Sequence, residues 1–392
     1  MRLSLCVPCA VSMALTLSLA CAQEPATAPA ATASAATVPV AAPSAAAPAY
    51  RSDPKFIDAL KEAKLLQKQK RSNFAEDAFK KANKIAGGQC QECLTGVFQM
   101  QMWQDNYKEA IATANTLVGM ATAPVDKSYY QSLLGQAYLA QGGEKAKPAQ
   151  LEAAHTAFQQ AIATYPKNAS AYFFDGKVLA RLGKMEEASA DFKQCLACSS
   201  PKDPSHLRAQ HFAENPELSL HKMAPAFEVT ALDGSRFNLD AMGGRVVLID
   251  FWATWCGPCN EELPHMKKIA KEFAGQPLVI ISVSWDSDAD KWKQFIQKNE
   301  MTWVQYRDAD HKLSDLFAIN AIPHYFTIDS DGVLTAEMMG SGSDVEGKLK
   351  KLIAKAREAQ TQTAASGPAP APATSPAATL PLRQVALERV PQ

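Results

Sequence analysis

Two neighbouring segments of the chain carry the same residue types 34 positions apart. Ala154 and Ala188 share this spacing, and so do Phe158 and Phe192. Between about 53 and 203 the sequence is rich in Ala, Lys, Glu, Gln and Leu, and apolar residues recur every three or four positions, as on one face of a helix. A repeat of this length holds two helices, which bury their apolar faces by stacking on the next pair. The spacing therefore predicts a stack of helix pairs.

The repeat resembles the tetratricopeptide repeat, in which small residues lie where two helices touch and a large residue lies beside them. We predict four pairs over 53–203, with Ala75 and Phe79 marking the first. Ala110 and Ala114 mark the second, displaced by 35 residues instead of 34, and an insertion at 142–148 lengthens the third. The resemblance implies a curved surface that docks a partner protein, of unknown identity, and a helical spacer that binds nothing is the alternative.

The N-terminus predicts export. The chain starts Met1-Arg2, and the mostly apolar residues 3–20 lead to Ala20-Cys21-Ala22, a small-x-small site of the kind that signal peptidase cuts. This apolar run contains Pro8 and is shorter than the ~20 residues needed to span a membrane. We predict a signal peptide at 1–22 and a periplasmic or otherwise extracytoplasmic protein. A lipoprotein with Cys21 lipidated is the alternative.

Low-complexity segments and a connector divide the rest of the chain. Residues 23–52 and 359–392 are dominated by Ala, Pro, Thr, Ser and Val or continue such a stretch, and we expect both to be disordered. Residues 204–221 are expected to connect the repeats to a second domain at 222–358. The 40 basic and 40 acidic residues cancel, which argues against nucleic acid as a partner.

The second domain alternates strands and helices, the pattern of an α/β unit. We expect hairpins across Asp233-Gly234 and Asp331-Gly332, at the start and near the end of the domain. Between them we expect a buried strand at 245–252, a helix at 257–273, a strand at 278–284, a helix at 288–300, a strand at 303–306 and a short helix at 311–317. A helix at 344–358 closes the domain. The predicted fold class is thus all-α repeats followed by an α/β domain.

Nine cysteines become informative once the signal peptide is set aside, because Cys6, Cys9 and Cys21 lie in it. The remaining six form three Cys-x-x-Cys pairs, at 90/93, 195/198 and 256/259. An even set of cysteines fits an oxidising compartment. No pair is followed by histidine, so covalent haem attachment is excluded, and we expect neither metal nor cofactor.

Cys256-Gly-Pro-Cys259 lies where the buried strand gives way to a helix. A Cys256 thiolate there would face the unpaired N–H groups at the start of the helix, which lowers a thiol pKa into a range of about 3.5–7.5. Cys259, one turn further in, is placed to resolve a mixed disulfide on Cys256. Pro258 lacks an N–H, which the first turn of a helix tolerates. The pair is therefore our candidate redox centre.

The segment Phe251-Trp-Ala-Thr-Trp-Cys-Gly-Pro-Cys259, followed by Pro264 and by Ala321-Ile-Pro323, resembles the thioredoxin superfamily. The extra elements and the signal peptide resemble its extracytoplasmic TlpA/ResA branch. The resemblance implies a thioredoxin fold over 222–358, a cis Pro323 packed against the cysteines, and an Ile322 backbone that pairs with substrate. It also implies that Asp250 shuttles the Cys259 proton, although a merely structural Asp250 is the alternative, and that Trp255, Gly257 and Pro258 position the substrate.

These residues predict a reductase of protein disulfides. The resemblance implies disulfide-bearing protein substrates, with apocytochrome c as one candidate, and electrons from a membrane thiol donor of the DsbD/CcdA type. Peroxiredoxins need Pro-x-x-x-Thr/Ser-x-x-Cys, and no such proline precedes Cys256. The alternative function is a repeat-based scaffold whose redox domain is vestigial. His265 and His324 are expected to be surface or packing residues.

The other two pairs lack the preceding aromatic, the Gly-Pro dipeptide and a cis-proline loop. Residues i and i+3 of a helix lie ~5 Å apart along the Cα trace, within the range of disulfides, although their side chains diverge unless a helix end distorts the backbone. Both pairs are expected at helix ends. We predict structural disulfides Cys90–Cys93 and Cys195–Cys198, with free or metal-bound thiols as the alternative.

Overall fold

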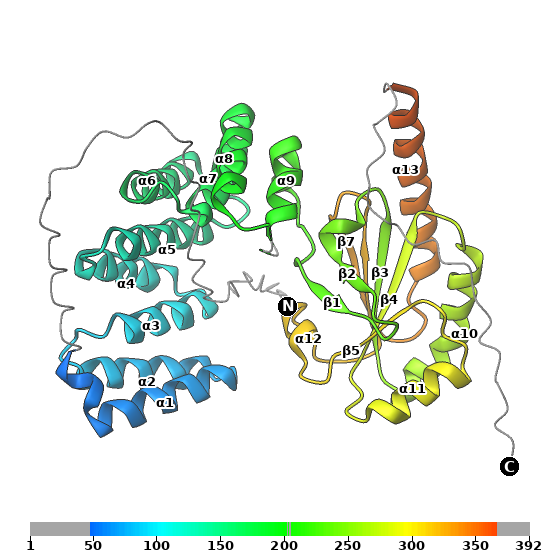
Figure 1. Ribbon diagram of the computed structural model, residues 1–392, viewed down its shortest axis with the longest axis horizontal. Coiled ribbons are helices and arrows are strands. Elements are labelled where there is room, and N and C mark those ends of the chain that lie inside the picture. The colour runs from blue at the N-terminus through cyan, green and yellow to red at the C-terminus, as the bar shows by residue number, and fades with distance from the viewer. Residues whose placement is uncertain (1–47, 202, 204, 367–392) are drawn as a thin grey trace, which may run out of the picture.

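The computed structural model describes residues 48–201, 203 and 205–366. The predicted signal peptide, Cys21, most of the first low-complexity segment and the end of the second lie outside the described residues. Figure 1 shows a stack of helices followed by a sheet with helices on its faces. This arrangement confirms the predicted fold class of helical repeats followed by an α/β domain. Within the described residues, no helix has the length and apolar character needed to cross a membrane.

Among the described residues, 54–198 form four consecutive helix pairs, consistent with the predicted repeats (Figure 1). Each helix packs on the next one in the chain. The helices are α1 (Pro54–Lys68), α2 (Ser72–Ile85), α3 (Gln91–Trp103), α4 (Tyr107–Met120), α5 (Pro124–Gly142), α6 (Pro148–Thr164), α7 (Ala169–Arg181) and α8 (Met185–Cys198). The predicted insertion at 142–148 forms the turn between α5 and α6.

Complementary volumes hold the third and fourth pairs together. Gly135 of α5 faces Phe158 of α6 so closely that a Cβ on the glycine would lie 2.6 Å from the ring. Gly176 and Phe192 repeat this contact between α7 and α8, with a corresponding distance of 2.9 Å. In the second pair the sizes are reversed, because buried Phe98 of α3 shares its core with Ala114 of α4. This reversal explains why the second repeat is faint in the sequence.

The expected connector is part of the helical stack. Within 204–221 the chain forms α9 (His206–Glu214) and a 3₁₀ helix, η2 (Pro216–Leu220). The Phe212 ring lies 5.2 Å from the Phe192 ring and 5.9 Å from the Phe173 ring, so α9 covers the apolar end of the last repeat. Arg208 of α9 donates to Asp240 of the α/β domain at 2.7 Å. The connector prediction therefore missed a capping helix that also contacts the next domain.

The first expected linker also ends earlier than predicted. Residues Ala49–Ser52 form a 3₁₀ helix, η1, immediately before α1. The Tyr50 ring packs edge-on against Phe56, with centroids 4.9 Å apart. Packing of an aromatic ring against the stack is favourable enough to hold this short segment in an ordered conformation.

The α/β domain begins with a hairpin, β1 (Glu228–Thr230) and β2 (Arg236–Asn238), followed by the 3₁₀ helix η3 (Leu239–Met242). A five-stranded sheet has the order β5-β4-β3-β6-β7. Its strands are β3 (Val246–Trp252), β4 (Leu278–Ser284), β5 (Val304–Arg307), β6 (His324–Ile328) and β7 (Leu334–Met339). The strands β3, β4 and β5 run parallel, whereas β6 pairs antiparallel with both β3 and β7. All seven residues of the central strand β3 are buried.

Alternate residues of β3 enter two cores. Val247, Ile249 and Phe251 pack with the β1–β2 hairpin and with α12 (Lys312–Leu316). Val246 and Leu248 pack on the opposite face against α10 (Gly257–Glu272) and α13 (Val345–Ser366). A further helix, α11 (Ala289–Lys298), follows β4. The sheet therefore holds the carboxyl end of β3 and the start of α10 in a fixed position.

The closing helix is longer than predicted. We expected it to end near Glu358, but α13 continues to Ser366. Residues 357–366 are mainly Ala, Gln, Glu and Arg, which favour helix, and Gly367-Pro368 follows them in the sequence. The composition that predicts disorder in this segment is also compatible with the continuation of a helix whose earlier turns are buried.

Candidate thiol-disulfide site

Cys256 and Cys259 form a disulfide at the junction of β3 and α10, with their Cα atoms 5.3 Å apart. Cys256 is the N-cap of α10, with extended backbone angles of φ −82° and ψ 107°. The Cys259 backbone N–H donates to the Cys256 sulfur at 3.2 Å. Each cysteine is only 6% exposed. This amide, together with the dipole of α10, would stabilise a thiolate on Cys256 after reduction.

An apolar wall and a proline loop surround the sulfurs. Trp252, Trp292, Ile296 and Met301 are buried in one cluster with the two cysteines. The Ile322–Pro323 peptide bond is cis, and the Ile322 carbonyl oxygen lies 3.9 Å from the Cys256 sulfur. The Gly340 N–H donates to the Pro323 carbonyl at 2.9 Å and joins this loop to the end of β7. The structure thus brings the two predicted segments together.

The predicted positioning residues differ in exposure. Trp255, directly before Cys256, is 64% exposed, and Met339 at the end of β7 is equally exposed. Gly257 and Pro258 occupy the first two positions of α10. A Cβ on Gly257 would meet no atom within 4 Å, so the space above the start of α10 is open.

Asp250 is buried in β3, on the face that α10 covers. It is 4% exposed, and its Oδ2 accepts a 2.8 Å hydrogen bond from Ser282. Burial, opposed by the hydrogen bond from the Ser282 hydroxyl and aided by the nearby Glu262 carboxylate, raises the pKa of Asp250 to about 7. A carboxyl group with a pKa near neutrality can both accept and return a proton at physiological pH.

Asp286 also supports the site, and it was missed from the sequence. Its two carboxylate oxygens accept from the Thr254 backbone N–H at 3.0 Å and from the Thr254 hydroxyl at 2.5 Å. The Ser284 hydroxyl adds a third bond at 2.6 Å. The buried Asp286 therefore fixes the loop before Cys256 to the end of β4. Its place two residues beyond a buried parallel strand was the available signal, because the carboxyl ends of neighbouring strands meet at one edge.

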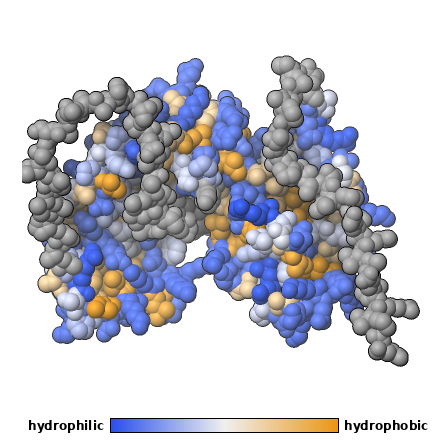
Figure 2. Space-filling model, in the orientation of Figure 1, coloured by the Kyte–Doolittle hydropathy of each residue, from blue (hydrophilic) through white to orange (hydrophobic). Residues whose placement is uncertain are grey.

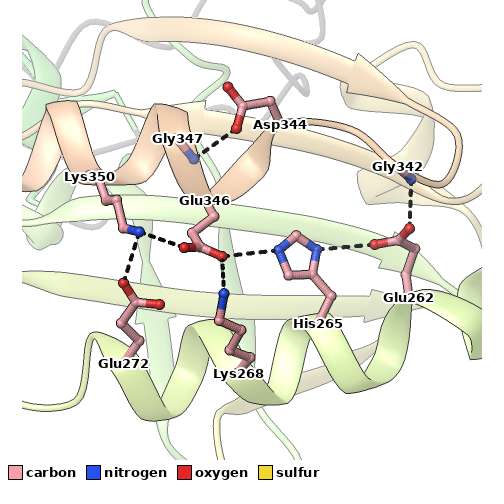
Figure 3. A network of polar contacts seen from close by, with 9 residues as sticks. All are labelled: Glu262, His265, Lys268, Glu272, Gly342, Asp344, Glu346, Gly347 and Lys350. Carbon is pink, nitrogen blue, oxygen red and sulfur yellow. Dashed lines mark hydrogen bonds and ion pairs between the residues drawn. The ribbon is translucent and has the colours of Figure 1, made fainter.

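A polar network joins α10 to α13 beside the site (Figure 3). His265 lies between two carboxylates, with Nδ1 3.2 Å from Glu262 and Nε2 3.5 Å from Glu346. Glu262 also accepts the Gly342 N–H at 2.6 Å, and Glu346 accepts from Lys268 at 2.8 Å. The first turns of α10 are therefore tied to the loop after β7 as well as to α13. His324, in contrast, is buried, and its Nε2 lies 3.0 Å from Glu337.

The other two cysteine pairs differ from each other. Cys90 and Cys93 form a disulfide at the start of α3. No disulfide joins Cys195 and Cys198, so that predicted bridge is wrong. Both residues lie inside α8, where regular helix geometry makes i and i+3 side chains diverge. Cys90 instead occupies an N-cap with extended backbone, which brings its sulfur over the first turn. Among the residues described here, no group of three His, Cys, Asp or Glu could hold a metal ion.

The sheet order, the N-cap disulfide and the opposing cis-proline loop define a thioredoxin-like thiol-disulfide site. Residues 220–337 match the AhpC/TSA family. The thiol-disulfide oxidoreductase ResA of Bacillus anthracis is 29% identical over 143 residues, which are 36% of this chain and 83% of ResA. The thioredoxin-like protein YneN of Bacillus subtilis (strain 168) is 30% identical over 132 residues, 33% of this chain and 76% of YneN.

A solved structure is also similar. The thioredoxin domain of a thiol-disulfide oxidoreductase from Bacteroides vulgatus is 27% identical, with a TM-score of 0.32, and the match covers 34% of this chain and 96% of that domain. The chain belongs to the thioredoxin-like thiol-disulfide oxidoreductases of the ResA/TlpA type. Each of these relatives matches about a third of the chain.

Proposed function

We propose that the protein is a reductase of protein disulfides and that Cys256 and Cys259 carry the reaction. The observation that supports this proposal best is the hydrogen bond from the Cys259 N–H to the Cys256 sulfur at the start of α10. A thiolate in that position is stabilised by the amide and by the helix dipole, so it is populated at neutral pH and can attack a disulfide.

The reaction has two exchange steps. The Cys256 thiolate attacks one sulfur of a substrate disulfide, which forms a mixed disulfide and releases the other substrate sulfur as a thiolate. The Cys259 thiol then loses its proton to Asp250, and its sulfur attacks Cys256, which releases the second substrate thiolate. The substrate gains two electrons, and Cys256 and Cys259 become a disulfide. Burial suits Asp250 to this role because it raises the carboxyl pKa to about 7.

The substrate polypeptide is expected to lie across the start of α10. The Ile322 backbone, before the cis Pro323, is the proposed partner for an extended substrate segment, since a segment paired there would lie next to the Cys256 sulfur. Exposed Trp255 offers the apolar contact on one side, and Gly257 and Pro258 leave the approach open.

Electrons are proposed to flow from the Cys256–Cys259 dithiol to the substrate. Cys-Gly-Pro-Cys in a thioredoxin context has a comparatively stable disulfide, which favours a reductant that is recharged by a membrane thiol donor of the DsbD/CcdA type. Apocytochrome c and other disulfide-bearing proteins are the proposed substrates. A redox titration of the Cys256–Cys259 pair tests this direction. A midpoint near about −270 mV supports the reductase, and one near about −120 mV contradicts it.

Activity is tested by insulin reduction with the wild type and with Cys256→Ser. We expect the variant to lose the activity, while Cys198→Ser, which changes a cysteine outside the site, keeps it. Equal rates for the wild type and Cys256→Ser would support the alternative, a repeat-based scaffold with a vestigial redox domain.

We also propose that the helix pairs dock a partner protein and that the protein works outside the cytoplasm. Stacked repeats present a continuous surface, and Figure 2 shows apolar patches at the α1–α2 end of the stack, where Ile57, Leu65 and Phe74 are exposed. The sequence pattern at 1–22 supports export, with lipidation of Cys21 as the alternative route. Fractionation of cells that produce the full chain, with and without Cys21→Ala, tests the export and the lipidation of Cys21.

A further inference from the structure

We propose that Cys90–Cys93 is a second thiol-disulfide exchange site, which reacts with a small carboxylate-bearing thiol that enters a cavity formed by η1, α1 and the start of α3. This proposal goes beyond the function of Cys256–Cys259 and is independent of it. The two pairs are separate in the chain, and their backbone geometry is nearly the same.

The backbone of Cys90 repeats that of Cys256. Cys90 is the N-cap of α3 with φ −86° and ψ 91°, close to the values of φ −82° and ψ 107° at Cys256. The Cys93 N–H donates to the Cys90 sulfur at 3.0 Å, as the Cys259 N–H does to the Cys256 sulfur at 3.2 Å. The Cα atoms of the pairs are 5.2 and 5.3 Å apart. After reduction, a thiolate on Cys90 would have the same amide and helix-dipole stabilisation as one on Cys256.

Two further contacts hold Cys90 in this position. The chain leaves α2 through Gly87 and Gly88, whose positive φ angles of 63° and 80° are accessible to glycine at little cost. The Cys90 N–H then donates to the Asn83 side chain at 3.0 Å. These contacts hold the cysteine backbone in addition to the disulfide.

A cavity of about 460 Å³ lies against Cys90, a size typical of small-molecule sites. Its lining carries three cationic side chains, from Arg51, Lys61 and Lys64, and one carboxylate, from Glu92. Lys64 and Glu92 are paired at 2.6 Å, which leaves an excess of positive charge. This excess favours a thiolate on Cys90 and also favours a ligand that carries carboxylates. Apolar side chains complete the lining: Tyr50, Phe56, Ile57 and Leu60.

Tyr50 limits access to the sulfurs. Cys90 is 1% exposed and Cys93 is fully buried, and Tyr50 packs against the cluster that contains both. The Tyr50 hydroxyl donates to the Gln89 carbonyl at 3.4 Å, next to Cys90. Because η1 has only four residues, its displacement would uncover the Cys90 side of the bridge and leave Cys93 buried. Cys90 is therefore the sulfur that an incoming thiol attacks.

The exchange is balanced without another reactant. The thiolate of the incoming thiol forms a bond to the Cys90 sulfur, and the Cys90–Cys93 bond breaks, with Cys93 leaving as a thiolate that takes up a proton. The thiolate of a second small thiol then attacks the small-molecule sulfur of the mixed disulfide and releases Cys90 as a thiolate. Two small thiols are oxidised to one disulfide, and one protein disulfide is reduced to two thiols. The reverse reaction reoxidises the pair.

The test uses the full chain with Cys256→Ser and Cys259→Ser, so that Cys90–Cys93 is the disulfide under study. The protein is equilibrated with mixtures of reduced and oxidised glutathione under native conditions, alkylated and mapped by mass spectrometry. We expect a reversible transition of the Cys90–Cys93 peptide, with the glutathione adduct on Cys90, while circular dichroism shows intact helices. A pair that stays oxidised in every mixture, or that is reduced only as the helices unfold, would overturn the proposal and leave a structural brace.

Two further arms test the recognition. Cysteamine, a cationic thiol, should react about tenfold more slowly than glutathione, and Lys61→Gln should reduce that preference. Tyr50→Ala should accelerate the reaction with both thiols. Tyr50→Phe keeps the ring on Phe56 and therefore disturbs the packing of η1 less than Tyr50→Ala does. Equal rates for the two thiols would overturn the assignment of an anionic substrate.

Discussion

The hydroxyl of Ser282 in β4 donates a 2.8 Å hydrogen bond to Oδ2 of Asp250, its register partner in β3. The Trp303 indole in turn donates to the Ser282 oxygen at 2.8 Å. The Ser282 bond favours the ionised carboxylate, yet burial outweighs it and raises the pKa of Asp250 to about 7. The native protein therefore holds a proton on Asp250 at pH values where the unfolded chain has already lost it.

This difference predicts how stability depends on pH. A folded-state pKa above the unfolded value contributes stability that is fully present below about pH 4 and is lost as the pH rises through about 7. The loss is about 4 kcal/mol, from roughly 1.4 kcal/mol for each pH unit. Asp250→Asn has no titrating group at this position and so lacks this pH-dependent loss. The free energy of unfolding of the variant, relative to that of the wild type, should therefore rise by about 4 kcal/mol between pH 4 and pH 8. Urea denaturation of the oxidised protein at several pH values measures the difference.

Ser282→Ala provides the control for that experiment. It removes a hydrogen bond to the carboxylate, so the pKa of Asp250 should rise further and the loss of stability should extend to higher pH. In the Asp250→Asn background the same substitution should leave the pH dependence unchanged. A pH profile of wild type that is parallel to that of Asp250→Asn would contradict the assignment of the raised pKa to Asp250.

Asp286→Ala should disturb the loop before Cys256. Three donors lose their acceptor in a buried place, the Thr254 N–H, the Thr254 hydroxyl and the Ser284 hydroxyl, and we expect a loss of about 3 kcal/mol in the free energy of unfolding. Insulin reduction should be slower by roughly tenfold or more, because the loop positions Cys256. Thr254→Val removes only one of these bonds and should have a smaller effect on both measurements. Unchanged rates for Asp286→Ala would show that the loop is held by other contacts.

The extent to which the sequence predicted this structure follows from how local each signal is. Strand and helix periods, the 34-residue spacing and the motif around Cys256 are local patterns, and they identified the helix pairs, the sheet strands and the redox pair. The contact of Asp286 with Thr254 spans 32 residues, and it depends on which strand ends become neighbours. The end of β4, two residues before Asp286, indicates that Asp286 lies at the edge of the sheet, but nothing near it in the sequence identifies Thr254 as its partner.

The cysteine pairs illustrate the same limit. The spacing is identical at Cys90/Cys93 and Cys195/Cys198, but the backbone of the first cysteine decides whether a bridge forms. Cys90 has extended angles because Gly87 and Gly88 end α2 before it, whereas Cys195 lies within the last turns of α8. The helix boundary that separates these cases is the feature that sequence patterns locate least well.

Gly135→Ala should destabilise the helical stack. The new Cβ would lie 2.6 Å from the Phe158 ring, and overpacking of this kind costs about 1–3 kcal/mol. Phe158→Leu in the same chain should recover part of the loss, because it removes the ring that the methyl group meets. Gly119→Ala in α4 is the matched control, since a Cβ there meets no atom within 4 Å, and it should be neutral or stabilising by about 0.5–1 kcal/mol. Thermal unfolding followed at 222 nm compares the variants.

Cys195 should resist alkylation in the native protein. Its side chain is 3% exposed, and burial, with smaller contributions from Asp203 and other neighbours, raises the pKa of its thiol to about 12. Only about one thiol in ten thousand would then be ionised at pH 8, and the thiolate is the form that reacts. Iodoacetamide labelling followed by peptide mass spectrometry should show Cys195 modified at the rate of unfolding, and fully modified in denaturant. Raising the pH from 8 to 9 should not accelerate the native reaction if opening of the stack is the slow step. Rapid labelling at pH 8 with intact helices would instead show that α8 exposes Cys195 without unfolding of the stack.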